Sequence, residues 1–458
     1  MGGLTRRGFF KQSAAAAAGV AAPAIVPSNV LARPGNPGAN DRIVIGGIGI
    51  GVMGSSLMRA FSGFDDVRVA AVCDVDMRKA NEAADGLDAD AYSDYRELLE
   101  REDIDAVVIA TPHHWHAVQT VHAAQAGKDI YCEKCLSHTI REGRLMAEAA
   151  HRHGRVLQTG SQQRSSARER VGCEFVREGG LGAIERVAAH HYMSPWLNGL
   201  PDEPIPDGLD WDMWCGPVQP QPYNHLLTAD TDEFTYGAWY STRAFGGGEI
   251  CCFGPHGLDI VQWALGMDEA GPEAVWTEGE PFAPEVMRPA LLDGEPASYC
   301  HHCYHSTELR GLAPKLYMRY PGGVEVEFGE AISSGARFTG EGGELTISRN
   351  TLESEPGDIA AELLEKAEAD EGQTENHHRN WLNCIKDRGK PVADVEIGHR
   401  SATVCHLGNI ARWVSEVTGE TGDELQWDAQ AERFTNSEWG NHFLDRPRRA
   451  PFQLPDDV

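Results

Sequence analysis

Short apolar runs alternate with segments of helical spacing between residues 42 and 165, which predicts repeated strand–helix units. The expected strands are 42–46, 67–75, 105–110, 129–132 and 155–159. The expected helices are 55–64, 95–100, 114–126 and 140–153. This alternation predicts an α/β domain with a parallel, doubly wound sheet, whose ligands bind at the carboxyl ends of the strands.

The second half of the chain carries a different pattern. Residues 315–320 and 324–328 flank the turn Pro321-Gly322-Gly323, and residues 337–339 and 344–347 flank a glycine-rich turn at 340–343. Strand signals separated by turns of this kind predict antiparallel hairpins. A second domain of another class therefore follows the parallel sheet.

The first 41 residues predict an export signal and a linker. The segment Thr5-Arg6-Arg7-Gly8-Phe9-Phe10-Lys11 precedes an Ala-rich apolar run, and Val30-Leu31-Ala32 offers a cleavage site of small residues. Twin arginines before a mildly hydrophobic segment are typical of the twin-arginine export route. We expect a signal peptide at 1–32, a Pro/Gly-rich linker at 33–41, and a periplasmic or secreted protein that is exported already folded.

A glycine motif follows the first expected strand. It has the form G-x-G-x-x-G and consists of Gly49, Ile50, Gly51, Val52, Met53 and Gly54. The first glycine makes a tight turn, the second lets the backbone approach a pyrophosphate, and the third packs helix against strand. Asp74 lies 20 residues after the last glycine, where its carboxylate can accept hydrogen bonds from ribose hydroxyls and would repel a 2′-phosphate. The motif therefore predicts NAD, with NADP disfavoured.

Charge and composition narrow the classes of partner. The net charge of −29 arises from 69 acidic and 40 basic residues. A field of this sign repels phosphate backbones, so nucleic acid is not an expected partner. No stretch after the N-terminal segment is apolar for long enough to span a bilayer. The 11 cysteines are scattered, unlike those of a small disulfide scaffold.

Taken together, these segments resemble the Gfo/Idh/MocA family of glucose–fructose oxidoreductase and inositol dehydrogenase. The matching pieces are the glycine motif, Thr111-Pro112-His113-His114-Trp115-His116, Glu133-Lys134, and a Gly-x-His-x-x-Asp that ends at Asp259. Residues 394–401 and 405–410 are similar to the twin-arginine-exported branch of that family.

The resemblance implies an architecture. A Rossmann domain at 42–165 would be followed at 166–375 by an α+β domain with a mostly antiparallel, open-faced sheet for substrate binding and oligomerisation. C-terminal helices and a tail, 376–458, would pack back on both domains. Because the family typically assembles through one face of that sheet, the resemblance implies a homodimer or homotetramer.

The resemblance also implies a site at the strand ends. Lys134 would lie beside the substrate oxygen and the cofactor, and His256 is the candidate base for the hydroxyl proton. The other implied cofactor contacts are Thr111, His113, His116 and Glu133, besides Lys134 itself. The implied substrate contacts are Tyr192, Cys252 and Asp259.

Three positions depart from the family pattern. Cys135 replaces the proline of Glu-Lys-Pro, His113 replaces the usual asparagine after Thr-Pro, and Cys252 replaces an aspartate. An aspartate one turn from His256 would raise the pKa of that histidine and hold a substrate hydroxyl. Cys252 can do this only as a thiolate, which requires a lowered pKa.

The cysteines and histidines raise the alternative of a metal site. Cys251, Cys252 and His256 are close in sequence, and further candidates follow at Cys300, His301, His302, Cys303 and His305. Mixed thiolate and imidazole ligands suit zinc. The Cys-x-x-Cys at 300–303 lacks a second paired motif, and strand alternation would put its two thiols on opposite faces. We therefore expect buried cysteines and surface histidines, and no metal.

Three functions remain open. The leading hypothesis is oxidation or reduction of a sugar or polyol carbinol by tightly bound NAD(H), which is recycled in place because a periplasm offers no free nicotinamide pool. The second is a redox-neutral glycoside hydrolase or epimerase, which oxidises a ring carbon, eliminates or inverts beside it, and reduces it again. The third is a non-catalytic sugar- or cofactor-binding protein, which the lost aspartate favours and the retained Lys134 and His256 oppose.

Overall fold

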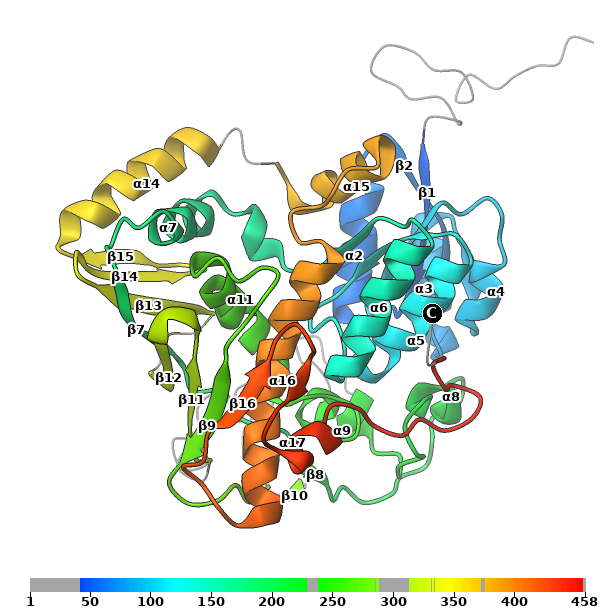
Figure 1. Ribbon diagram of the computed structural model, residues 1–458. Coiled ribbons are helices and arrows are strands. Elements are labelled where there is room, and N and C mark those ends of the chain that lie inside the picture. The colour runs from blue at the N-terminus through cyan, green and yellow to red at the C-terminus, as the bar shows by residue number, and fades with distance from the viewer. Residues whose placement is uncertain are drawn as a thin grey trace, which may run out of the picture.

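The computed structural model describes residues 42–228, 238–284, 286–287, 313–330, 332, 334–371 and 375–455. The predicted export signal and linker, and the Cys/His-rich segment at 300–305, lie outside the described residues. Figure 1 shows two sheets side by side, with a long helix, α16 (Val395–Thr418), running between them.

The first domain is built on a six-stranded sheet. All of its strands are parallel, in the order β3-β2-β1-β4-β5-β6. The strands are β1 (Ile43–Ile48), β2 (Val67–Cys73), β3 (Asp90–Tyr92), β4 (Ala106–Ile109), β5 (Asp129–Cys132) and β6 (Leu157–Thr159). The helices between them are α2 (Val52–Ser62), α3 (Met77–Leu87), α4 (Tyr95–Leu99), α5 (His113–Gln125) and α6 (Ile140–Arg152). This confirms the predicted parallel Rossmann sheet.

The element boundaries follow local chemistry. Asp76 and Thr139 cap the N-termini of α3 and α6, because their side chains accept hydrogen bonds from the first free backbone N–H groups. Several predicted bounds differ by one to three residues: α2 begins at Val52, β2 ends at Cys73, so that Asp74 follows the strand, and α5 begins at His113. Helix α3 and the short strand β3 were not predicted.

The second domain has a nine-stranded sheet. Its order is β15-β14-β13-β7-β12-β11-β9-β16-β17, and the pairs are antiparallel except for β12 with β7. The strands are β7 (Ile184–His190), β9 (Ala274–Glu278), β11 (Lys315–Arg319), β12 (Glu325–Glu330), β13 (Gly335–Gly340), β14 (Gly343–Ser348), β15 (Leu352–Glu355), β16 (Leu425–Asp428) and β17 (Arg433–Phe434). Both predicted hairpins are present, as β11–β12 and β13–β14.

Helices pack on one face of this second sheet. They are α7 (Ala167–Arg177), α11 (Gly254–Ala264) and α16. Shorter elements lie between β7 and β11 in the chain: β8 (Leu197–Asn198), α8 (Trp211–Cys215), α9 (His225–Thr228), α10 (Glu249–Cys252) and β10 (Val286–Met287). The remaining helices are α14 (Gly357–Glu371), α15 (His377–Asp387) and α17 (Glu438–His442).

The C-terminal part of the chain contacts both sheets. Trp381 of α15 packs against Phe61 under the Rossmann sheet, with ring centroids 5.3 Å apart. Strands β16 and β17 extend the second sheet, and α16 is buried over most of its length. A long helix that is buried on all sides joins two cores, which fixes the strand ends of the first domain against the second.

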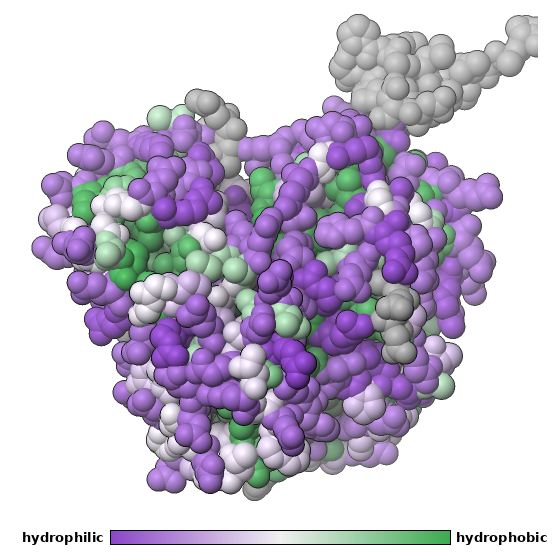
Figure 2. All heavy atoms as spheres, viewed as in Figure 1, coloured by the Kyte–Doolittle hydropathy of each residue, from purple (hydrophilic) through white to green (hydrophobic). Residues whose placement is uncertain are grey.

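The face of the molecule shown in Figure 2 is mostly hydrophilic, in keeping with the charge excess of the sequence. Among the described residues, no helix has the length and apolar character needed to cross a membrane.

Candidate functional site

The glycine loop has the shape that the motif predicts. Gly49 has φ +85°, and a Cβ there would lie 2.8 Å from the backbone N of Thr111. At Gly54 a Cβ would lie 1.8 Å from the carbonyl O of Gly49, so only glycine lets α2 approach β1 this closely. A Cβ at Gly51 would meet no atom within 4 Å, which leaves open space at the N-terminus of α2. Helix N-termini favour phosphate groups.

Asp74 is placed beside this loop. Its Oδ2 accepts a hydrogen bond from the Ile50 backbone N at 2.6 Å, and its Oδ1 accepts one from the Asp76 backbone N at 2.8 Å. Burial raises the pKa of Asp74, and these two hydrogen bonds oppose that shift. The carboxylate thus holds the glycine loop and remains at the wall of a cavity.

That first cavity, of about 330 Å³, lies along the carboxyl ends of the Rossmann strands. The predicted cofactor residues in its wall are Gly49, Gly51, Val52, Met53, Asp74, Thr111, His113, Glu133 and Lys134. The segments of the second domain add Trp214 and Trp239 to the opposite wall. Glycine loop, acidic residue and aromatic cover together fit a dinucleotide.

A second cavity, of about 400 Å³, adjoins the first. Met53, Lys134 and Cys252 line both. The rest of the second wall includes Gln163, Glu169, His256 and Arg349. A molecule in the second cavity would therefore meet a molecule in the first at Lys134 and Cys252.

Lys134 sits at this junction because of contacts made by the loop after β5. Its Nζ donates a hydrogen bond to the carbonyl O of Cys252 at 3.2 Å, and its backbone N donates to Glu133 Oε2 at 3.1 Å. Glu133 also accepts from Gln162 Nε2 at 3.1 Å and is buried. Burial raises the pKa of Glu133, and the charge of Lys134 opposes that shift. The ammonium group is thus held at the wall shared by the two cavities.

His256 is buried in the second cavity beside a cation. Arg349 Nη2 lies 3.2 Å from its Nδ1 and 3.3 Å from its Nε2. Burial, followed by the charges of Lys134 and Arg349, lowers the pKa of His256 well below its usual range. The imidazole is therefore neutral at neutral pH.

Cys252 does not supply the negative charge of the aspartate that it replaces in the family pattern. Burial raises the pKa of the Cys252 thiol, although the charge of Lys134 opposes the shift. The condition for a thiolate, a lowered pKa, is not met. The Cys252 thiol is therefore neutral, and it does not raise the pKa of His256 as a carboxylate at this position would.

Two histidines after Thr111-Pro112, His113 and His116, have different roles. His113 Nε2 accepts a hydrogen bond from the Cys135 backbone N at 3.3 Å, and burial lowers the pKa of this ring, which keeps it neutral. Its proton is then on Nδ1, which has no partner within the described part of the chain. His116 lines neither cavity; its ring nitrogens lie 2.8 Å from the carbonyl O of Thr111 and 2.9 Å from that of Cys135. His113 is thus a donor for a ligand, and His116 joins two loops.

Two predicted substrate residues do not line either cavity. Asp259 is buried in an ion pair with Arg164, with Nε–Oδ2 and Nη2–Oδ1 distances of 2.8 Å each, and accepts a hydrogen bond from Ser401. The ring of Tyr192 is buried 4.8 Å from that of His190. Asp259 on α11 and Tyr192 after β7 thus make buried contacts within the protein.

Sequence reasoning did not single out Gln163, Glu169 or Arg349, which lie in the second cavity. Arg349 follows β14 in a turn, and no motif marks it. Burial raises the pKa of Glu169, which favours a protonated carboxyl group.

Comparisons with known proteins agree with this arrangement. The model of the Gfo/Idh/MocA oxidoreductase family for the NAD-binding Rossmann fold matches residues 43–161, and the model for its C-terminal alpha/beta domain matches 183–288 and 309–454.

A Shewanella pealeana protein named as a glycosyl hydrolase of family 109 is 31% identical over 170 residues, which are 32% of this chain and 37% of that protein. An inositol 2-dehydrogenase of Salmonella typhimurium is 31% identical over 149 residues, 32% of this chain and 44% of that protein. The chain thus spans less than half the length of these curated relatives.

The WlbA dehydrogenase of Bordetella pertussis, solved in complex with NADH and UDP-GlcNAcA, has a similar fold. Its TM-score is 0.55 at 18% sequence identity, and the match covers 81% of this chain and 97% of that one.

Proposed function

Because the chain belongs to the Gfo/Idh/MocA oxidoreductase family, we propose that it is an NAD-dependent oxidoreductase that acts on a CH–OH group of a sugar or polyol. One observation carries the proposal: Lys134 lies at the wall shared by the dinucleotide cavity and the cavity of His256. A carbinol held there meets a cation, a neutral base and the place of a nicotinamide together.

The residues of the first cavity would hold NAD by its parts. The open side of Gly51 and the N-terminus of α2 suit the pyrophosphate, and Asp74 suits the adenosine ribose hydroxyls. A 2′-phosphate beside Asp74 would meet a like charge, which favours NAD over NADP. Bound NAD would supply the nicotinamide ring, which takes a hydride from the carbinol carbon or returns it.

Lys134 and His256 would then have different roles at the substrate oxygen. The Lys134 ammonium donates a hydrogen bond to the substrate oxygen and stabilises negative charge that develops on it. The neutral His256 imidazole accepts the hydroxyl proton. Since the charges of Arg349 and Lys134 disfavour a lasting imidazolium, His256 has to pass this proton on.

Export through the twin-arginine route, with the cofactor inserted beforehand, is part of this proposal. A cofactor that cannot exchange with a cytoplasmic pool must be regenerated in place, either by a second substrate or by return of the hydride to the first. Assembly as a homodimer or homotetramer through the second sheet is proposed on the resemblance alone.

A second candidate function is redox-neutral cleavage or epimerisation of a glycoside. Glu169, whose carboxyl lines the cavity of His256 and whose pKa is raised by burial, favours it, because a protonated acid can protonate a leaving group. Similarity to family 109 glycosyl hydrolases over about a third of this chain points the same way.

Protein purified without added nucleotide tests these functions. It is denatured, and any released nucleotide is identified by mass spectrometry; native protein is then incubated with polyols, aldoses and aryl glycosides. Retained NAD(H) with a net oxidised sugar product supports the oxidoreductase. Retained NAD(H) with hydrolysis or inversion and no net oxidation supports the second candidate. Nucleotide or sugar binding without turnover of any compound would favour a binding protein and contradict both.

A further inference from the structure

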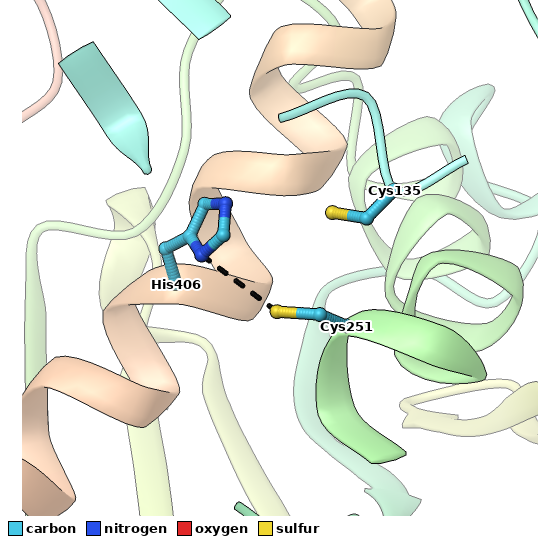
Figure 3. A group of neighbouring side chains, drawn as sticks. All are labelled: Cys135, Cys251 and His406. Atoms are coloured by element: carbon cyan, nitrogen blue, oxygen red, sulfur yellow. Dashed lines mark hydrogen bonds between the residues drawn. The ribbon is translucent and has the colours of Figure 1, made fainter. Parts of the chain in front are cut away.

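Three side chains from distant parts of the chain meet behind the proposed active site (Figure 3). Cys135 lies on the loop after β5, Cys251 on α10 and His406 on α16. The two Sγ atoms and one imidazole nitrogen lie within 4.8 Å of one another, and all three residues are buried. Neither cavity includes any of them in its wall, so the proposed function does not use this cluster.

The spacing of the cluster suits ligands of one ion. Cys251 Sγ lies 3.7 Å from His406 Nδ1. Two ligands of a tetrahedral Zn²⁺, with Zn–S of about 2.3 Å and Zn–N of about 2.0–2.1 Å, would be separated by about 3.6 Å. The observed distance, which is within reach of a hydrogen bond to sulfur, also agrees with two ligands of one metal ion.

The residues around His406 orient its ring in the way that is usual for a metal-bound histidine. His406 Nε2 lies 3.1 Å from the carbonyl O of Ser137. A proton on Nε2 is satisfied by that carbonyl, which leaves the lone pair of Nδ1 on the side of Cys251 Sγ, as Figure 3 shows. Metal-bound imidazoles commonly donate their second N–H to a backbone carbonyl in this way.

A polar group also supports the sulfur of Cys251. Asn409 Nδ2 donates to Cys251 Sγ at 3.6 Å and to the carbonyl O of Gly247 at 2.7 Å. An amide N–H stabilises a thiolate, which is the form that binds metal.

We propose that Cys135, Cys251 and His406 bind one Zn²⁺ ion. Binding by these three ligands converts two thiols to thiolates and releases two protons, so two thiolates, one neutral imidazole and Zn²⁺ carry no net charge. A neutral set avoids the cost of burying an uncompensated ion. No bond is oxidised or reduced in this step.

The ion would position the catalytic lysine. Cys135 directly follows Lys134, and Cys251 directly precedes Cys252, whose carbonyl accepts a hydrogen bond from Lys134 Nζ. A metal ion that joins these two segments to α16 would fix the distance between the loop of Lys134 and α10. Its role is structural, because none of the three ligands lies in the wall of either cavity, so a substrate held there does not reach the ion.

This site differs from the metal alternative raised by the sequence. That alternative joined Cys251, Cys252 and His256, but Cys252 and His256 line the second cavity, whereas Cys251 lies with His406. The ligand set includes Cys135, the residue that replaces the family's proline.

The test begins with wild-type protein produced with zinc in the medium and purified under reducing conditions. Elemental analysis should find about one zinc per chain. Replacement of the metal by Co²⁺ should give the intense near-ultraviolet absorption of thiolate-to-cobalt charge transfer. Both readouts use the unmodified protein and do not depend on activity.

Variants then identify the ligands. Cys251→Ser and Cys135→Ser should each lose most of the bound zinc and the cobalt absorption, whereas Cys173→Ser should keep both. Cys173 is a matched control, since it is an equally buried thiol on α7, outside the cluster. Circular dichroism shows whether each variant is folded.

Three results would overturn the proposal. They are wild-type protein without zinc even after refolding in the presence of Zn²⁺, full zinc content in the folded Cys135→Ser and Cys251→Ser variants, and a Cys135–Cys251 disulfide in the protein purified under reducing conditions. The first of these results is measured on the wild-type protein, so it can contradict the proposal even if the variants fail to fold.

Discussion

Replacing Lys134 by methionine keeps the length of the side chain and removes its charge. The ammonium lies at the wall shared by the two cavities and hydrogen-bonds to the carbonyl O of Cys252 at 3.2 Å. Removal of one donor that stabilises developing charge costs about 2.7–4 kcal/mol, or roughly 10²–10³ in rate. We expect a loss of that size in kcat for Lys134→Met, with NAD still bound.

The same change should move the pH profile. The charge of Lys134 is one of the causes, after burial, that lower the pKa of His256. Without that charge the imidazolium is less disfavoured, so the pKa of His256 rises and the base is protonated at a higher pH. The acid limb of the rate profile should therefore shift to higher pH in Lys134→Met.

Single-turnover formation of bound reduced cofactor, measured across pH with the sugar or polyol found by screening, reports both effects. Lys366→Met, on the exposed side of α14, serves as a control for the loss of one lysine. A variant with a rate within about threefold of wild type and an unshifted acid limb would refute the assignment of Lys134. A purely structural role would lower the rate without moving the limb.

Three further outcomes are expected. Asp74→Ser should raise the affinity for NADP relative to NAD by roughly tenfold in fluorescence titrations, because a like charge beside the 2′-phosphate is removed; unchanged selectivity would contradict the role of Asp74. Asp259→Asn should lower the free energy of unfolding in urea by about 1.5–3 kcal/mol, because it removes one of the two carboxylate partners of the buried Arg164 and leaves Asp268 as the other; a stable variant with only weakened sugar binding would support Asp259 as a substrate residue. Burial opposes ionisation of Glu396 and Glu432, but hydrogen bonds and opposite charges lower the pKa of each from 4.5 to about 2. Their stabilisation is present above pH 4.5 and is lost as pH falls toward 2, so replacement of both by glutamine should flatten the decline of thermal stability in that range.

The fold was predictable from local patterns. Glycines at 49–54 and the alternation of apolar runs with helical segments define the Rossmann sheet, and turns such as 321–323 define the hairpins of the second sheet. Both signals depend on residues that are neighbours in sequence.

The site was predictable only in part, because its remaining contacts join distant segments. Arg349 reaches His256 across 93 residues, and Arg164 reaches Asp259 across 95. No spacing shows that Asp259 already has a buried partner, and none shows that Cys251 faces His406, 155 residues away. The sequence motifs predicted residues at the junction of the two cavities, but which of those residues line a cavity depends on tertiary packing.

Transfer of deuterium tests the central claim most directly. Protein loaded with NAD is incubated with sugars and polyols deuterated at carbon, and the nucleotide released on denaturation is analysed by mass spectrometry. Our account predicts that at least one of these compounds delivers a single deuterium to the nucleotide in wild-type protein, and much more slowly in Lys134→Met. An NAD-loaded protein whose nucleotide gains no deuterium from any sugar, polyol or glycoside would contradict the proposed oxidoreductase.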